Sequence, residues 1–96
     1  MYARLSRAPV KSENRAEMLE KIKQLATETH ELPGVRFWLT LLSADGELTV
    51  VGGYDDKAAC DRTSHVNKTR WNDANHMLEK EPTIVEGEVL AFITPR

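Results

Sequence analysis

The chain has 96 residues and a formal net charge of −2, and 41% of its residues are hydrophobic. A chain of this length supports one hydrophobic core, so we expect a single domain over residues 1–96. The charge provides no basic surface for nucleic-acid phosphates, and no apolar run approaches the roughly 20 residues of a membrane-spanning helix. We therefore expect neither nucleic acid nor a membrane as a partner.

The start of the chain and its cysteine content indicate a cellular compartment. Arginines stand near the N-terminus where a signal peptide has its apolar stretch. The single cysteine, Cys60, cannot form an intrachain disulfide, which fits a reducing environment. Both observations predict a cytoplasmic protein.

The chain opens with a predicted strand and a predicted amphipathic helix. An apolar stretch at Tyr2–Ala8 precedes a helix near Glu13–Glu31, for which Ser12 is a candidate N-cap. The segment Leu32–Gly34 ends the helix, because the residue before a proline avoids helical angles and glycine allows a reversal. Apolar residues recur at helical spacing, with a threonine continuing the stripe: Met18, Leu19, Ile22, Leu25, Ala26 and Thr29.

A second strand is predicted at Val35–Leu42, with two different faces. One row of alternating residues is wholly apolar: Val35, Phe37, Leu39 and Leu41. The other row is mixed: Arg36, Trp38, Thr40 and Leu42. We expect the apolar row to lie under the helices. The Trp38 row should then face a partner chain or a ligand, since a solvent-facing row rarely contains both a tryptophan and a leucine.

A β-hairpin follows. Ser43–Gly46 reads as its turn, with the Asp-Gly pair supplying positive backbone angles. The returning strand is Leu48–Tyr54. Its internal pair Gly52-Gly53 indicates a bulge or a close approach of neighbouring groups.

The second helical region is predicted in two pieces. Asp55 or Asp56 caps a short helical turn through Cys60, and a break follows at Asp61–Ser64. Ser64 is then a candidate cap for a longer helix that runs to about Leu78. Its apolar face contains Trp71, Ala74, Met77 and Leu78.

The last predicted element is a strand at Thr83–Thr94, with Gly87 as a candidate bulge. The element order is therefore βαββαβ. This order predicts a ferredoxin-like α+β fold, a four-stranded antiparallel sheet with helices on one face. The other face needs a cover, and we expect a second copy of the chain to provide it.

Three segments carry a resemblance to a known family. They are Leu32-Pro33-Gly34-Val35, the strand segment Leu48–Asp55, and Thr63-Ser64-His65-Val66. Together with the element order, they resemble the antibiotic-biosynthesis-monooxygenase-like domains of the dimeric α+β barrel superfamily. The resemblance covers nearly the whole chain. It implies a homodimer in which two sheets pack face to face, with a ligand cavity between each sheet and its own helices.

The resemblance also implies a range of activities. Members of the family oxidise phenols, quinols or polyketide aromatics with oxygen and without metal or flavin. Others degrade haem or isomerise lactones. Our leading hypothesis is a small monooxygenase-like enzyme that acts on an aromatic or quinol-type compound without a bound cofactor. The alternatives are a non-enzymatic dimeric domain for small-ligand binding or stress response, and a cofactor-free isomerase or decarboxylase.

Cofactor-free oxygenation needs a dry pocket, a polar group on the proton path and donors for a developing oxyanion. Asn67 lies four residues before Trp71, so a helix places it on the core-facing side. A polar amide there must find a partner or line a wet pocket. The alternative is that Asn67 bonds local backbone near the helix start.

His65 is the second catalytic candidate, as a general base that titrates near neutral pH. It lies six residues before Trp71, roughly 120° away around a regular helix. It therefore faces a cavity only if the helix breaks at Asp61–Ser64. The alternative is an exposed histidine in the first turn.

Three aromatic residues are candidates for substrate binding: Tyr54, Trp38 and Trp71. Each also has a simpler interpretation, because aromatic residues dominate cores and interfaces. Trp71 can be plain core, Trp38 a dimer contact, and Tyr54 half-buried packing at a strand end.

Haem and metal chemistry fit the sequence less well. The haem-degrading branch relies on an asparagine near the first strand, together with a tryptophan and a histidine in the second helical region. Here the first strand has no asparagine, and Trp71 and His76 are only five residues apart. His65 and His76 share a helix face but stand roughly 16 Å apart along the axis. We therefore expect no metal site and no cofactor.

Overall fold

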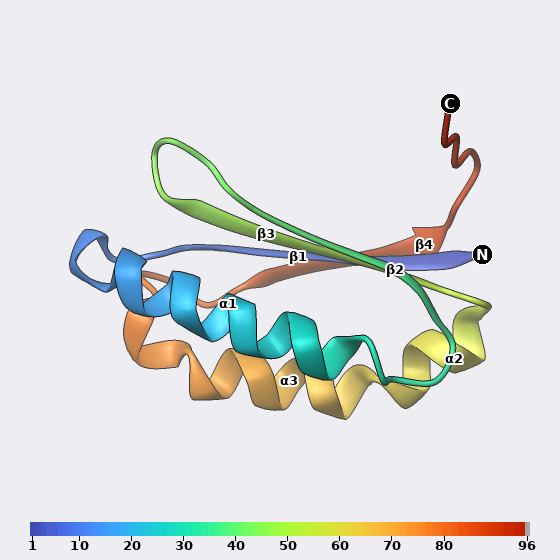
Figure 1. Ribbon diagram of the computed structural model, residues 1–96, viewed down its shortest axis with the longest axis horizontal. Helices are drawn as coiled ribbons and strands as arrows, with labels where there is room; N and C mark the ends of the chain where they lie inside the picture. The colour runs from blue at the N-terminus through green and yellow to red at the C-terminus, as the bar shows by residue number, and fades with distance from the viewer. Residues whose placement is uncertain (96) are drawn as a thin grey trace.

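A computed structural model describes residues 1–95 of the chain. Its elements are β1 (Tyr2–Pro9), η1 (Ser12–Asn14), α1 (Arg15–Thr29), β2 (Val35–Leu42), β3 (Glu47–Tyr54), α2 (Lys57–Arg62), α3 (Ser64–Asp73), η2 (Asn75–Met77) and β4 (Thr83–Glu88). The strands form one antiparallel sheet in the order β2-β3-β1-β4. All three α-helices lie on the same side of it (Figure 1). The predicted βαββαβ order and α+β fold are confirmed.

The faces of β2 are the reverse of our prediction. Trp38 pairs with Gly52 in the ladder and lies beneath the helices, where it lines two cavities. Leu39 and Leu41 lie on the open face of the sheet, 51% and 48% exposed. The predicted place under the helices is therefore wrong for Leu39 and Leu41 and correct for Val35, and the predicted place of Trp38 on the outer face is wrong.

An irregularity in β2 explains this reversal. The pairing register shifts between Val35 and Phe37, so strict alternation fails at the start of the strand. Val35 consequently packs on the helix side with Tyr54 and Cys60, while Phe37 lies on the open face with Leu39. A pattern read with a constant period of two could not show this, because one extra residue exchanges the two rows.

The core lies between the helices and the first and third strands. Its larger cluster contains the predicted apolar face of the second helical region, together with α1 and strand residues: Ala8, Val10, Met18, Leu48, Trp71, Ala74, Met77 and Leu78. Met18 is the main anchor of α1, at 2% exposed. Burying a side chain of this size contributes about 1.5–3 kcal/mol. Leu19, which we predicted in the same stripe, is 50% exposed.

The start of α1 also differs from the prediction. Ser12 begins a 3₁₀ turn, and the N-cap position is Asn14, whose side chain makes no cap bond. Instead, the Asn14 amide donates to Glu17 at 3.0 Å. The helix ends at Thr29, and Gly34 adopts a positive φ of 80° at the reversal into β2, as the Pro-Gly signal predicted.

The glycines of the hairpin have separate functions. Gly46 alone supplies a positive φ in the turn, at 92°, and Asp45 does not. Gly52 and Gly53 pair in regular register with β1, whereas the register with β2 shifts opposite Gly53, between Val35 and Phe37, so the irregularity lies in the neighbouring strand. The alternative expectation of a close approach is confirmed, because a Cβ on Gly53 would collide with the ring of Phe37.

The second helical region breaks where expected and ends earlier. Asp56 caps α2 by accepting a hydrogen bond from the Ala59 amide at 2.8 Å. The break falls at Thr63, but Ser64 does not cap α3 with its side chain. The helix ends at Asp73 rather than near Leu78, and a 3₁₀ turn follows.

The last strand is shorter than predicted. It ends at Glu88 rather than Thr94, and Gly87 pairs with Ala3 in regular register, so it forms no bulge. Beyond the strand, the ring of Phe92 stacks on that of Phe37, with the ring centroids 4.8 Å apart.

Candidate functional site

Two small cavities lie between the sheet and the helices. The first, which we call the polar cavity, has a volume of about 30 Å³. Its polar wall includes Arg4, Ser6, Tyr54, Thr63, Asn67 and Arg70. The second, the apolar cavity, has a volume of about 40 Å³. Its wall is mostly apolar and includes Met18, Ile22, Leu25, Leu48, Trp71 and Ala74. Each has room for one or two water molecules.

The two cavities adjoin one another. Their common wall consists of Trp38, Val50, Asn67 and Arg70. Two of these side chains, Asn67 and Arg70, project from α3, and the other two from the sheet.

A much larger depression, which we call the outer groove, runs between α3 and β4. It has a volume of about 460 Å³, within the range of small-molecule sites. Asn67 and Trp71 line it from α3, and Ile84 and Glu86 line it from β4. The sheet therefore supplies one wall of the groove and the helix the other.

Asn67 connects these spaces, because it lines the polar cavity, the apolar cavity and the outer groove. Trp71, one helical turn later, lines the apolar cavity and the groove. The sequence prediction that Asn67 and Trp71 share the core-facing side of a helix is confirmed. The alternative interpretation of Trp71 also holds in part, since it is 8% exposed and belongs to the core.

The other predicted site residues separate into two groups. Trp38 lines both cavities, and Tyr54 lines the polar cavity. His65 lies on the exposed side of α3 and lines neither cavity nor the outer groove. The helix does break at Thr63, but the break does not turn His65 inward. Its expected place at the cavity is wrong.

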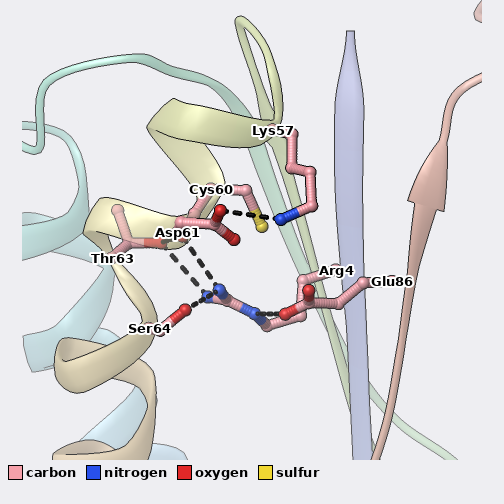
Figure 2. Close-up of polar contacts among 7 residues, drawn as sticks. All are labelled: Arg4, Lys57, Cys60, Asp61, Thr63, Ser64 and Glu86. Atoms are coloured by element: carbon pink, nitrogen blue, oxygen red, sulfur yellow. Dashed lines mark hydrogen bonds and ion pairs between the residues drawn. The ribbon is translucent and has the colours of Figure 1, made fainter.

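A buried arginine organises one end of the site (Figure 2). Arg4, on β1, is 3% exposed, and its Nε lies 2.7 Å from a carboxylate oxygen of Glu86 on β4. Its Nη1 donates to the Thr63 hydroxyl at 3.1 Å. Its Nη2 donates to the Cys60 carbonyl at 2.9 Å and the Ser64 hydroxyl at 2.7 Å. Arg4 therefore ties the edge strand to the junction of α2 and α3.

The same contacts explain the helix termini. The Thr63 and Ser64 hydroxyls both accept hydrogen bonds from Arg4, the Thr63 hydroxyl also donates to the Cys60 carbonyl at 2.7 Å, and neither accepts from an amide at the start of α3. Glu86 and the Arg4 cluster were missed by the sequence interpretation. The available signal was the alternation of β4, which places Glu86 opposite Arg4 on the row beneath the helices.

The electrostatics of this cluster keep Arg4 charged. Burial alone would lower the pKa of Arg4, but the hydrogen bond to Glu86 and neighbouring negative groups outweigh it, so the pKa is raised. Burial also raises the pKa of the Cys60 thiol, and the nearby Arg4 only partly opposes this. Cys60 is fully buried and stays a neutral thiol at neutral pH.

Among residues 1–95, no three side chains of histidine, cysteine, aspartate or glutamate are grouped in a way that could hold a metal ion. Within the same residues, no helix combines the length and the apolar character required to cross a membrane.

Several proteins of known structure share this fold. No protein-family model and no curated protein matches the chain. A candidate antibiotic biosynthesis monooxygenase from Nitrosomonas europaea matches with a TM-score of 0.80 at 19% identity, over 95% of this chain and 100% of that one. A second, from Deinococcus radiodurans, matches with a TM-score of 0.81 at 14% identity, over 100% of this chain and 99% of that one. This chain has the fold of the antibiotic biosynthesis monooxygenases.

The monooxygenase fold does not by itself give an activity. Another protein from N. europaea, described as of unknown function, matches with a TM-score of 0.81 at 21% identity, over 99% of this chain and 94% of that one. Identities at this level show a shared fold alone, and one fold carries many functions. The resemblance predicted from the sequence is confirmed for the fold, and function must be argued from the site.

Proposed function

We propose that the chain binds a small aromatic or quinol-type compound where the outer groove meets the interior cavities, and oxidises it with molecular oxygen. The observation that carries this proposal is the position of Asn67, whose amide lines the groove and both cavities. The indole of Trp71 provides an apolar wall one helical turn away. A ring that enters the groove would meet both side chains.

Each residue has a defined task in this proposal. The Glu86 carboxylate, held by Arg4, accepts the proton of a phenolic substrate in the groove. The Asn67 amide donates a hydrogen bond to the resulting oxyanion. The electron-rich ring then reacts with oxygen. In a phenol, the ring C–H para to the hydroxyl, the phenolic O–H and one O₂ become a para-quinone and one water, so the substrate supplies all four electrons and no other reductant is required.

The test is oxygen uptake with a panel of phenols and quinols. We expect Asn67→Ala to reduce turnover by at least about 100-fold, the effect of losing one oxyanion donor in other enzymes. His65→Ala is the matched control, because His65 lies on the same helix but outside the site. Equal loss in both variants, or loss in His65→Ala alone, would contradict the assignment.

The small size of the interior favours a second candidate function, a binding domain without turnover. Cavities of about 30 and 40 Å³ do not hold a reacting ring unless side chains move. Such a domain would bind aromatic compounds in the outer groove and consume no oxygen. Calorimetry alongside oxygen uptake separates the two functions.

We also propose that a second copy of the chain covers the open face of the sheet. The support is the apolar character of that face, where Leu39, Leu41 and Val85 are 51%, 48% and 67% exposed. Exposed apolar groups gathered on one sheet face are typical of an interface. Sedimentation analysis tests this, since a monomer at all concentrations would exclude the dimer.

A further inference from the structure

Two arginines line the polar cavity, and within residues 1–95 only one of them is paired with an acid. Arg4 makes an ion pair with Glu86 and three further hydrogen bonds. Arg70, on α3, is half-buried and lines both the polar and the apolar cavity. It makes one side-chain hydrogen bond, from Nη1 to the Thr29 hydroxyl at 2.7 Å. It forms no ion pair among residues 1–95.

Arg70 therefore keeps most of its hydrogen-bonding capacity. A guanidinium has five N–H donors in a fixed fork, and the bond to Thr29 uses one of them. Glu28 and Asp73 line a surface depression that Arg70 also reaches, but neither forms an ion pair with it. A partly buried cation without an acid is unfavourable unless solvent or a ligand satisfies it.

The surroundings of Arg70 determine which ligand fits. No carboxylate lines the polar cavity, whereas two guanidinium groups, hydroxyls and the Asn67 amide do. The adjoining apolar cavity provides Trp38, Trp71 and aliphatic side chains. A ligand that matches both walls carries an anionic oxygen on an apolar ring.

We propose that Arg70 is the anion-recognition residue of this site, and that the ligand is an aromatic acid with a carboxylate or second phenolate oxygen, distinct from the hydroxyl that Glu86 deprotonates, against the Arg70 guanidinium. This inference rests on the proposed function for the place of the ring, in the outer groove beside Trp71. The ring stays in the groove beside Asn67, and only its acidic end reaches the interior, where the cavities are too small for the ring itself.

These contacts predict that the site binds an anionic ligand more tightly than a neutral ligand of the same shape. A charge-assisted hydrogen bond to arginine is stronger than a neutral one, and a planar guanidinium can bind a carboxylate through two parallel bonds. The anion should therefore bind about tenfold or more tightly than its neutral isostere, in line with the 1.4 kcal/mol that corresponds to a factor of ten. Lysine in place of arginine would keep the charge and lose the two-bond geometry.

The experiment measures binding and does not depend on turnover. Benzoate, its neutral isostere benzamide, and 4-nitrophenol are titrated into the full chain by calorimetry. The absorbance of nitrophenol also reports whether the bound form is the phenolate. We expect benzoate or nitrophenolate to bind at least about tenfold more weakly to Arg70→Gln, and Arg70→Lys to recover part of the loss.

Two further variants separate charge recognition from packing. Thr29→Val removes the bond between α1 and α3 but keeps the cation, so it should lower thermal stability as Arg70→Gln does and reduce binding much less. Arg62→Gln removes an exposed arginine that lines neither cavity and should leave binding unchanged.

The outcomes are distinct for the two proposals. Binding of benzoate alone identifies a carboxylate ligand, and binding of nitrophenolate alone identifies a phenolate. Equal affinity for benzoate and benzamide, no binding of either acid, or unchanged affinity in Arg70→Gln would overturn the assignment of Arg70. Acid binding without oxygen uptake from any phenol would leave Arg70 assigned and contradict the proposed oxidation.

Discussion

The two faces of the sheet are made from the same strands and differ in almost every physical respect. The face under the helices contains the buried Arg4, Leu48 and Tyr54, together with the cavities. The open face carries exposed leucines and the exposed Arg7. The buried polar strand residues and the cavities therefore lie on one side. The other side exposes apolar side chains.

The sharpest contrast is between two arginines on β1, three residues apart and on opposite faces. Arg4→Ala removes four hydrogen bonds and leaves Glu86 without its partner, so we expect a loss of about 3–5 kcal/mol in the free energy of unfolding. Arg7→Ala is the control, because Arg7 is 57% exposed and lies 3.8 Å from Glu47. Its expected cost is below about 1 kcal/mol. Denaturant unfolding measures the free energy of unfolding of both variants. Equal losses in Arg4→Ala and Arg7→Ala would contradict the difference that we expect between the two faces.

Two leucines on opposite faces of the sheet allow the same comparison of the faces for apolar side chains. Leu48→Ala, on the helix face, should cost about 2–5 kcal/mol, since Leu48 is 3% exposed and belongs to the core. Leu39→Lys, on the open face, should leave the fold of the subunit intact and shift the proposed dimer towards monomer. Circular dichroism measures the first effect, and sedimentation the second. A folded dimer in Leu39→Lys would place the interface elsewhere.

Alanine substitutions at two glycines should have a smaller effect on stability. Gly53→Ala should cost about 1–3 kcal/mol, because its methyl group would collide with the ring of Phe37. Gly87→Ala is the matched control on the edge strand, since nothing lies within 4 Å of a Cβ there. Thermal melting of the two variants compares them directly. Equal shifts in melting temperature would mean that the approach of Phe37 does not restrict β3.

The smallest expected effect concerns the surface pair between α1 and η2. The hydrogen bond with His76, at 2.9 Å, and one from Asn14 lower the pKa of Glu17. A carboxyl group with a lowered pKa in the folded state stabilises the protein above its unfolded pKa, and this contribution disappears as the pH falls through the folded value. Glu17→Gln should therefore lose less stability than the parent chain on acidification below about pH 4.5. Parallel pH profiles of stability would show that the pair contributes nothing.

Most of the fold was predictable from local signals. The helical period of Met18 and Ile22, the turn at Gly46 and the cap at Asp56 each depend on neighbours in sequence, and the structure confirms them. The faces of β2 were not predictable, because a register shift near Phe37 depends on how the strand pairs with β3.

The candidate site divides in the same way. Asn67 and Trp71 were found because helical spacing alone places them on one face. The pair of Arg4 and Glu86 is 82 residues apart in sequence and arises only when β1 and β4 pair. His65 was misplaced because the local break at Thr63 shows where a helix starts, and not how it is rotated about its axis.

The most direct test of the account uses the two tryptophans of the chain as reporters. Trp38 and Trp71 both line the apolar cavity, and Asn67 lies between that cavity and the outer groove. Nuclear magnetic resonance can follow their indole N–H signals while 4-nitrophenol is added. We expect both indole signals to shift with one common affinity for 4-nitrophenol, and we expect this affinity to be lower in Asn67→Ala. Saturable binding that moves neither indole signal would contradict it.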